Sequence, residues 1–221
     1  MIPFVTKLTA TAAVTNAVCL AQQKVGAGNL TINGTLAVAG VATLNTNNFG
    51  TKVTIYSTGD LHGINFTIYG TGQYGNSISE TLVGPNNATV TSLNYFATVT
   101  RVAVDASVST NVILGNANAT ASPWFVPNRH QVANMGIGCQ VGGTVNYTVQ
   151  VTFDDVMNQA TSAANQFVFS LPTSLTAQTT SKLDSILFPV GAVRVVLSSS
   201  GGAVTDFVKM TIIDSCLGPS F

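Results

Sequence analysis

Three side chains in the first half of the chain have the types that general acid–base catalysis requires. Asp60 and His62 lie two residues apart in STGDLHG, and Glu80, the one glutamate of the chain, lies in the stretch Gly63–Pro85. A carboxylate and an imidazole at this spacing could act as an acid–base pair. The same residues are typical of a turn, because Asp caps turns through its side chain and Gly adopts positive φ. We therefore interpret Asp60 and His62 as turn residues.

The other carboxylates, Glu80 and the pair Asp154 and Asp155, are also interpreted as structural residues. A glycosidase needs two opposed carboxylates, and the chain has only eight acidic residues. We interpret Glu80 as facing water, on the strand face opposite Ile78 and Leu82. Asp154 and Asp155 follow a strand pattern in TFDDV, and no calcium-loop spacing continues from them. A strand end is the preferred interpretation of that pair.

Nucleophilic catalysis and cofactor binding have no sequence signature here. There is no G-x-S-x-G motif, and His62 and His130 are the only imidazoles available as bases. The segments VGAGN and MGIGC contain G-x-G but not the full dinucleotide-binding pattern. Sequence therefore predicts no catalytic and no cofactor-binding residues.

The three cysteines, Cys19, Cys139 and Cys216, are far apart and odd in number. No C-x-x-C or Cys/His cluster suggests a zinc site or a disulfide framework. We predict that they are small apolar residues of a core or an interface, and that the chain has no metal ligands.

Composition favours a structural or assembly role over a charged-ligand role. Hydrophobic residues make up 46% of the chain, charged residues only 7%, and the formal net charge is zero. An ordinary soluble domain is about 25% charged, and binding to nucleic acid or anionic lipid depends on basic residues. The eight basic residues are scattered, so neither partner is expected. A weakly charged surface rich in Thr, Ser, Asn and Gly is typical of one that neighbours cover.

The N-terminal segment, MIPFVTKLTATAAVTNAVCLAQQ, lacks the continuous apolar core and cleavage site of an export signal. No apolar run reaches the roughly 18 residues that a membrane-spanning helix requires. We expect a protein made in the host cytoplasm without an export signal, and no contact with a membrane.

Period-two alternation of apolar residues predicts strands along most of the chain, as at Ile64, Phe66 and Ile68. Asn33-Gly34 has the composition of a hairpin turn, and the glycines after Tyr69 mark a chain reversal. TSLTAQTTSKLDS is predicted to be a polar loop. The segment from Ala12 to Lys24 could be a helix or an extended arm.

The predicted fold is all-β, with two antiparallel sandwich-type domains and an extended N-terminal arm. Residues 1–28 form the arm or a first strand, residues 29–120 an N-terminal β domain, and residues 124–221 a C-terminal β-sandwich. The joining segment, Asn116–Arg129, contains Pro123, Trp124 and Pro127, and is interpreted as a linker.

Two places are candidate partner contacts. Trp124 and Phe125 lie between prolines. They are either an exposed anchor for a partner or an aromatic plug between two domains, and the sequence favours neither interpretation over the other. The N-terminal end, with Met1, Ile2, Pro3 and Phe4, could add a strand to a neighbour's sheet edge.

Three segments, AGNLTINGTLAVAGVATL, GINFTIYGTGQYGNSISETLVGP and GTVNYTVQVTFDDV, resemble parts of small β-rich virion proteins of tailed bacteriophages. These are the head decoration (cement) proteins and related minor structural proteins. The resemblance implies a non-enzymatic protein on the outer surface of the head, which binds the major capsid protein and copies of itself, often as a homotrimer. It implies no catalytic residues, no nucleic acid and no small-molecule substrate.

Two other classes stay open. A receptor- or glycan-binding module of a phage tail would stack exposed aromatic side chains, such as Tyr69, Tyr74, Tyr95 or Trp124, on sugar rings. Their dispersal along the chain argues against it. A hydrolase of cell-wall or capsule polymers ranks last, because the acidic residues are so few.

Overall fold

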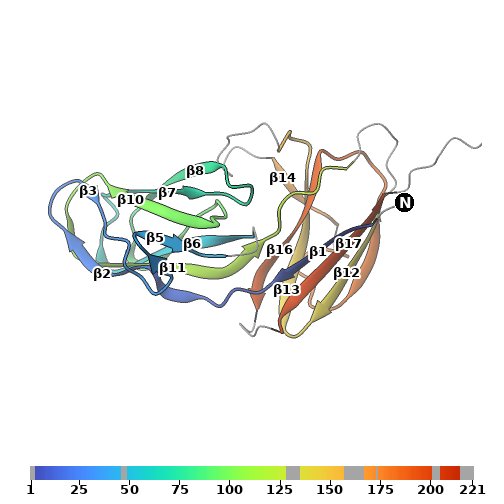
Figure 1. The fold of residues 1–221 in the computed structure, drawn as a ribbon, viewed down its shortest axis with the longest axis horizontal. Coiled ribbons are helices and arrows are strands. Elements are labelled where there is room, and N and C mark those ends of the chain that lie inside the picture. Colours follow the sequence, from blue (N-terminus) through green and yellow to red (C-terminus); the bar gives the residue numbers. More distant parts are fainter. Residues whose placement is uncertain are drawn as a thin grey trace, which may run out of the picture. The chain divides into compact units, whose positions relative to one another are not determined.

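The structure is a computed structural model that describes residues 3–45, 49–127, 135–156, 167–172, 174–200 and 205–214. Seventeen strands and no helix occur in these ranges, so the all-β prediction is confirmed (Figure 1). Consequently, no helix in the described ranges is long and apolar enough to span a membrane. The described residues form two compact units. Among the described residues, the N-terminal unit is Thr11–Thr120, and the C-terminal unit combines those up to Ala10 with those from Ala121 onward.

The N-terminal unit contains two antiparallel sheets. The first has the order β4 (Ala37–Val38), β5 (Val41–Thr43), β10 (Thr98–Val104), β7 (Asn65–Thr71) and β8 (Ser77–Val83), and β3 (Gly28–Asn29) also pairs with β10. The second has the order β11 (Val108–Ala121), β6 (Gly50–Asp60) and β9 (Asn86–Thr91), and β2 (Val14–Lys24) also pairs with β11.

A shared core joins these two sheets. Phe66 and Ile68 of β7 belong to the same buried cluster as Val53 and Ile55 of β6. Alternate residues of each strand enter the cluster, because successive side chains on a strand point to opposite faces. The N-terminal unit is therefore a sandwich, as predicted.

The C-terminal unit also has two antiparallel sheets. One has the order β1 (Phe4–Thr9), β17 (Phe207–Asp214), β12 (Met135–Gly142) and β15 (Lys182–Ile186). The other contains β14 (Val168–Ser170), β13 (Val145–Thr152) and β16 (Ala192–Ser200). Leu8, Met210 and Ile137 of the first sheet are buried, as are Tyr147 and Val195 of the second.

The Asn33-Gly34 turn prediction is wrong. The tight hairpin lies a few residues later, between β4 and β5, where Ala39 and Gly40 have φ values of 50° and 79°. Gly34 instead lies against β2: its N–H donates to the carbonyl of Val18 at 2.9 Å, and an added Cβ would lie 2.3 Å from the carbonyl oxygen of Asn16. Glycine is needed there for close backbone approach.

The first 28 residues are divided between the units. β1 pairs with β17 along its whole length, and β2, which is a strand and not a helix, pairs with β11. The N-terminal segment from Phe4 to Thr9 thus occupies a sheet edge of its own chain, which differs from an arm that is open to a neighbour's edge.

Two other segments are more ordered than the sequence suggests. The last residues of the predicted polar loop belong to β15, which pairs with β12. The expected linker begins inside β11 and then follows β16, where the N–H of Ser122 donates to the carbonyl of Val195 at 2.9 Å. Phe125 forms an isolated bridge with Val193. Backbone pairing therefore makes the proline-rich segment part of the C-terminal unit.

Candidate interaction surfaces

Asp60 and His62 lie at the end of β6, as the turn interpretation requires. The backbone N–H of His62 donates to Oδ1 of Asp60 at 2.9 Å, and the N–H of Gly59 donates to Oγ of Ser57 at 3.1 Å. The Asp60 carboxylate therefore caps the turn that follows the strand.

Glu80 is buried, so the expectation that it faces water is wrong. Its side chain is only 8% exposed, on the same face of β8 as the half-buried Ile78 and Leu82. Residues two apart on a strand share a face, and this period places the carboxylate inward. Its two oxygens accept the backbone N–H groups of Leu93 and Asn94, at 2.7 and 2.8 Å. Glu80 thus binds the segment that follows β9 to β8.

The other predicted groups also have structural partners. Oδ2 of Asp154 accepts the N–H of Phe167 at 2.8 Å, which supports the strand-end interpretation. Cys19 and Cys139 are buried, and burial raises the pKa of each thiol to about 12. His130 and Cys216 lie outside the described residues. Within the described ranges, no group of three or more His, Cys, Asp or Glu side chains could hold a metal.

The predicted partner residues have different environments. Met1 and Ile2 lie outside the described residues, and Pro3 is exposed. The rings of Phe4 and Phe125 stack with centroids 4.3 Å apart and an interplanar angle of 30°, so the structure brings these two together.

Trp124 is only 7% exposed and packs with Val156 and Ala192 of its own unit. The guanidinium of Arg194 lies over its ring at 4.3 Å. Trp124 is therefore a core residue of the C-terminal unit in this structure, and not an exposed anchor.

Sequence reasoning missed a surface group of aromatic residues, the phenylalanine cluster, defined as Phe153, Phe169 and Phe188. The Phe153 ring lies 5.8 Å from that of Phe169 and 6.5 Å from that of Phe188, and the three side chains are 59%, 49% and 41% exposed. In the sequence Phe153 continues the alternation of Val149 and Val151, but β13 ends at Thr152. Beyond the strand end the period no longer applies, and the ring meets solvent.

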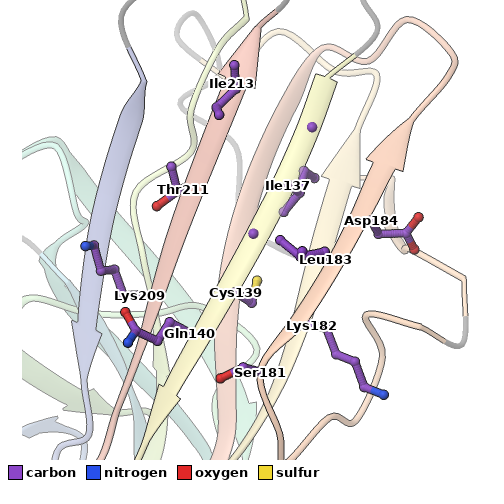
Figure 2. A pocket seen from close by; sticks show the side chains of 12 residues that line it. Ile137, Cys139, Gln140, Ser181, Lys182, Leu183, Asp184, Lys209, Thr211 and Ile213 are labelled. Atoms are coloured by element: carbon purple, nitrogen blue, oxygen red, sulfur yellow. The ribbon is translucent and has the colours of Figure 1, made fainter.

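A second surface lies on the outer face of the β1-β17-β12-β15 sheet. Gly136 and Gly138 of β12 point outward, alternating with the buried Ile137 and Cys139. They line an open groove of about 690 Å³, together with Leu183 and Ile213 (Figure 2). Leu183 of β15 is 86% exposed.

The fold of the chain does not itself require glycine in this groove. A Cβ added to Gly136 would meet nothing within 4 Å, and one added to Gly138 would meet only the flexible Leu183 Cδ2 at 3.2 Å. By contrast, a Cβ on Gly70 would lie 1.9 Å from the carbonyl oxygen of Thr98. A strand glycine without an internal steric cause is typical of a place that another molecule approaches closely.

No protein-family model matches the chain, and no curated protein matches it in sequence.

Proposed function

We propose that the chain is a non-enzymatic structural protein of a bacteriophage particle, which binds neighbouring subunits of the major capsid protein and decorates and stabilises the head. The observation that carries the proposal is the phenylalanine cluster, a group of exposed aromatic side chains on one unit. Aromatic residues are enriched at the energetic centres of protein interfaces, and monomers rarely leave contiguous apolar patches uncovered.

The use of the acidic residues supports a structural role. Glu80 binds two backbone amides, Asp60 caps a turn and Asp154 binds the amide of Phe167. A general acid or base must reach a substrate proton. Here the three carboxylates are occupied with holding the ends of strands and turns, which is what a rigid shell component needs.

The phenylalanine cluster is the surface that we assign to the capsid. Phe167, 74% exposed, is held next to it, because its carbonyl accepts the Oγ1–H of Thr152 at 2.8 Å and its N–H binds Asp154. Contacts of this size are individually weak. On a capsid, however, each bound copy has many neighbours at fixed spacing, and the effective concentration makes several weak contacts cooperate.

The test is sedimentation of the purified chain with undecorated phage heads, compared with the chain alone. We expect the wild-type chain to pellet with the heads and the variant Phe153→Ser/Phe188→Ser to stay in the supernatant. Val25→Ser is the matched control, because Val25 is 95% exposed but belongs to the N-terminal unit, whereas the cluster belongs to the C-terminal unit. It should bind as the wild type does.

A wild-type chain that never pellets with heads would exclude the decoration role. Binding that Phe153→Ser/Phe188→Ser and Val25→Ser weaken equally would exclude the cluster as the contact. Thermal unfolding of each variant shows whether a loss of binding follows from a loss of folding.

Glycan binding is a second candidate, since the exposed rings lie beside Asp154, the pattern expected of a sugar site. The planes of Phe153 and Phe169 are 65° apart, however, and do not offer one flat platform for a sugar ring. Binding to a glycan array, abolished by Phe153→Ser, would favour this candidate over the capsid contact.

A further inference from the structure

We propose that the outer face of the β1-β17-β12-β15 sheet pairs with the same face of a second copy of this chain. The two-fold axis would run along the strands, between β17 and β12. The pairing deepens the proposed structural role and rests on it for the presence of neighbouring copies, but it can be measured without any capsid.

The register of the sheet aligns the outward side chains in rows across the four strands. One row contains Val5, Thr211, Gly138 and Leu183, which are directly opposite one another from β1 to β15. Residues directly opposite in an antiparallel pair share a face. Val5 is 48% and Leu183 86% exposed, so both ends of this row are apolar and open to solvent.

A two-fold axis between β17 and β12 reverses the strand order of the second copy. Leu183 then faces Val5 of the second copy, and Thr211 faces Gly138 of the second copy. In the next row, Ile213 of β17, 44% exposed, faces Gly136 of the second copy, because Ile213 is directly opposite Gly136 within the sheet. Thr211 and Ile213 of β17 each meet a glycine and so have room between the two sheets, while Leu183 and Val5 pack against each other at the flanks.

The charges of the face also fit this arrangement. Lys7 and Lys209 are opposite each other within one copy, and Gln140 is opposite Lys209 on the other side. In the pair, Lys209 faces the Gln140 of the second copy, whose amide oxygen accepts its N–H groups, and Lys7 faces Ser181. No lysine stands directly opposite a lysine across the interface, which limits the charge repulsion between the two copies.

The area of the proposed interface limits how strongly two copies can associate. Four strands about 4.8 Å apart and about six residues long cover about 400 Å² per copy, or about 800 Å² in total. That is below the roughly 1,200 Å² of stable complexes. The pairing is therefore weak between free chains and becomes substantial where other contacts hold the copies together.

Sedimentation velocity of the full chain, at concentrations up to about 1 mM, measures the pairing. We expect a concentration-dependent monomer–dimer equilibrium. Gly136→Arg should reduce the association constant at least tenfold, because its side chain fills the groove while its Cβ has open space in the monomer. Gly63→Arg is the matched control: an added Cβ there also meets nothing within 4 Å, but Gly63 lies in the N-terminal unit.

Cross-linking tests which residues face each other across the two-fold axis, in a chain where Cys216 is replaced by Ser. A short bis-maleimide should cross-link a mixture of Thr211→Cys and Gly138→Cys chains into mixed dimers more efficiently than either variant alone. Equal yields in all three samples, a strictly monomeric chain, or dimers that Gly136→Arg leaves unchanged would each overturn the proposal. Head binding, measured separately, reports on the decoration role alone.

Discussion

Glu80 accepts the backbone N–H of Asn94 at 2.8 Å through one carboxylate oxygen, while its other oxygen accepts that of Leu93 at 2.7 Å. β8 thereby holds the backbone that connects β9 to β10. A buried carboxylate with two amide donors is a strong structural contact, because hydrogen bonds to charged groups contribute more than neutral ones. Glu80, a candidate catalytic residue by its type, therefore has a structural role: it connects β8 to the segment between β9 and β10.

Replacement of Glu80 by Gln tests this role. The amide of Gln has one acceptor oxygen, so one of the two backbone N–H groups would lose its partner and face another N–H. We expect Glu80→Gln to lower the free energy of unfolding of the N-terminal unit by about 2 kcal/mol, the cost of an unsatisfied buried donor. Chemical denaturation followed by far-ultraviolet circular dichroism measures the change.

Thr81→Ala is a suitable control, because Thr81 is the exposed neighbour of Glu80 on β8 and loses only a solvent-exposed hydrogen bond to Thr67. It should shift the unfolding midpoint much less. If Glu80→Gln leaves the midpoint unchanged, the two hydrogen bonds do not stabilise the fold; if it abolishes a turnover reaction instead, the structural assignment of Glu80 is wrong.

The sequence predicted the class of the fold because strand periodicity is local information. Alternation at Phe66 and Ile68 is enough to define β7, and the glycines after it define the reversal into β8. The same period, applied correctly, would have placed Glu80 on the face of Ile78. Periodicity cannot predict the hydrogen-bond partners of Glu80, because the amides of Leu93 and Asn94 lie beyond the next strand in sequence.

The two groups of strand glycines should respond in opposite ways to the addition of one methyl group. Gly70→Ala would place its Cβ 1.9 Å from the backbone oxygen of Thr98, which cannot move away without breaking the β7–β10 pairing. We expect a loss of about 3 kcal/mol or more. Gly136→Ala meets nothing within 4 Å and should be neutral or add about 0.5 kcal/mol by restricting the unfolded chain.

Differential scanning calorimetry of the two variants measures this contrast. A destabilised Gly136→Ala variant would show that the glycine serves the fold of the monomer and does not keep the groove open for another molecule.

The buried thiols should be inert in the folded chain. Burial raises the pKa of Cys19 and of Cys139 to about 12, and the thiolate is the reactive form. With Cys216 replaced by Ser, we expect no rapid reaction with a chromogenic disulfide reagent at pH 8, and two reactive thiols after addition of denaturant. A rapid reaction of either thiol in the native chain would contradict the burial.

The same shifts predict a loss of stability in alkali. In the unfolded chain these thiols release their protons near the ordinary pKa of 9.0, whereas in the folded chain they keep them up to about 12. The unfolded state therefore binds fewer protons between pH 9 and 12, so stability is fully present below pH 9 and falls as the pH rises through this window. Unfolding midpoints at a series of pH values should show the decline, and Cys19→Ala/Cys139→Ala should make it shallower.

The candidate surfaces were less predictable than the fold. The exposure of Phe153 depends on β13 ending at Thr152, and the groove depends on the register that sets Leu183 beside Gly138. Neither a strand end nor a register is encoded in the spacing of one segment. Trp124 could not be placed from the sequence either. The flanking prolines favour a linker, but backbone pairing with β16 makes the segment part of the C-terminal unit.

Trp124 and Arg194 offer a direct probe of that unit. Trp124 is the only tryptophan, so its fluorescence reports unfolding of the C-terminal unit without labelling. Arg194 is 7% exposed, lies over the Trp124 ring at 4.3 Å, and donates its Nε–H to Oε1 of Gln150 at 2.9 Å. Arg194→Lys loses the planar stack and the Nε donor, and should cost about 1–3 kcal/mol.

Arg101→Lys is the matched comparison, because the guanidinium of Arg101 also lies over an aromatic ring, that of Tyr69, at 3.7 Å, but on an exposed position. Water screens and competes with the exposed contact, so its loss should cost less than about 1 kcal/mol. Calorimetry measures both variants, and the tryptophan emission follows Arg194→Lys alone. Equal costs for the two arginines would mean that burial does not strengthen the Arg194–Trp124 contact, and that Trp124 is held by its apolar neighbours instead.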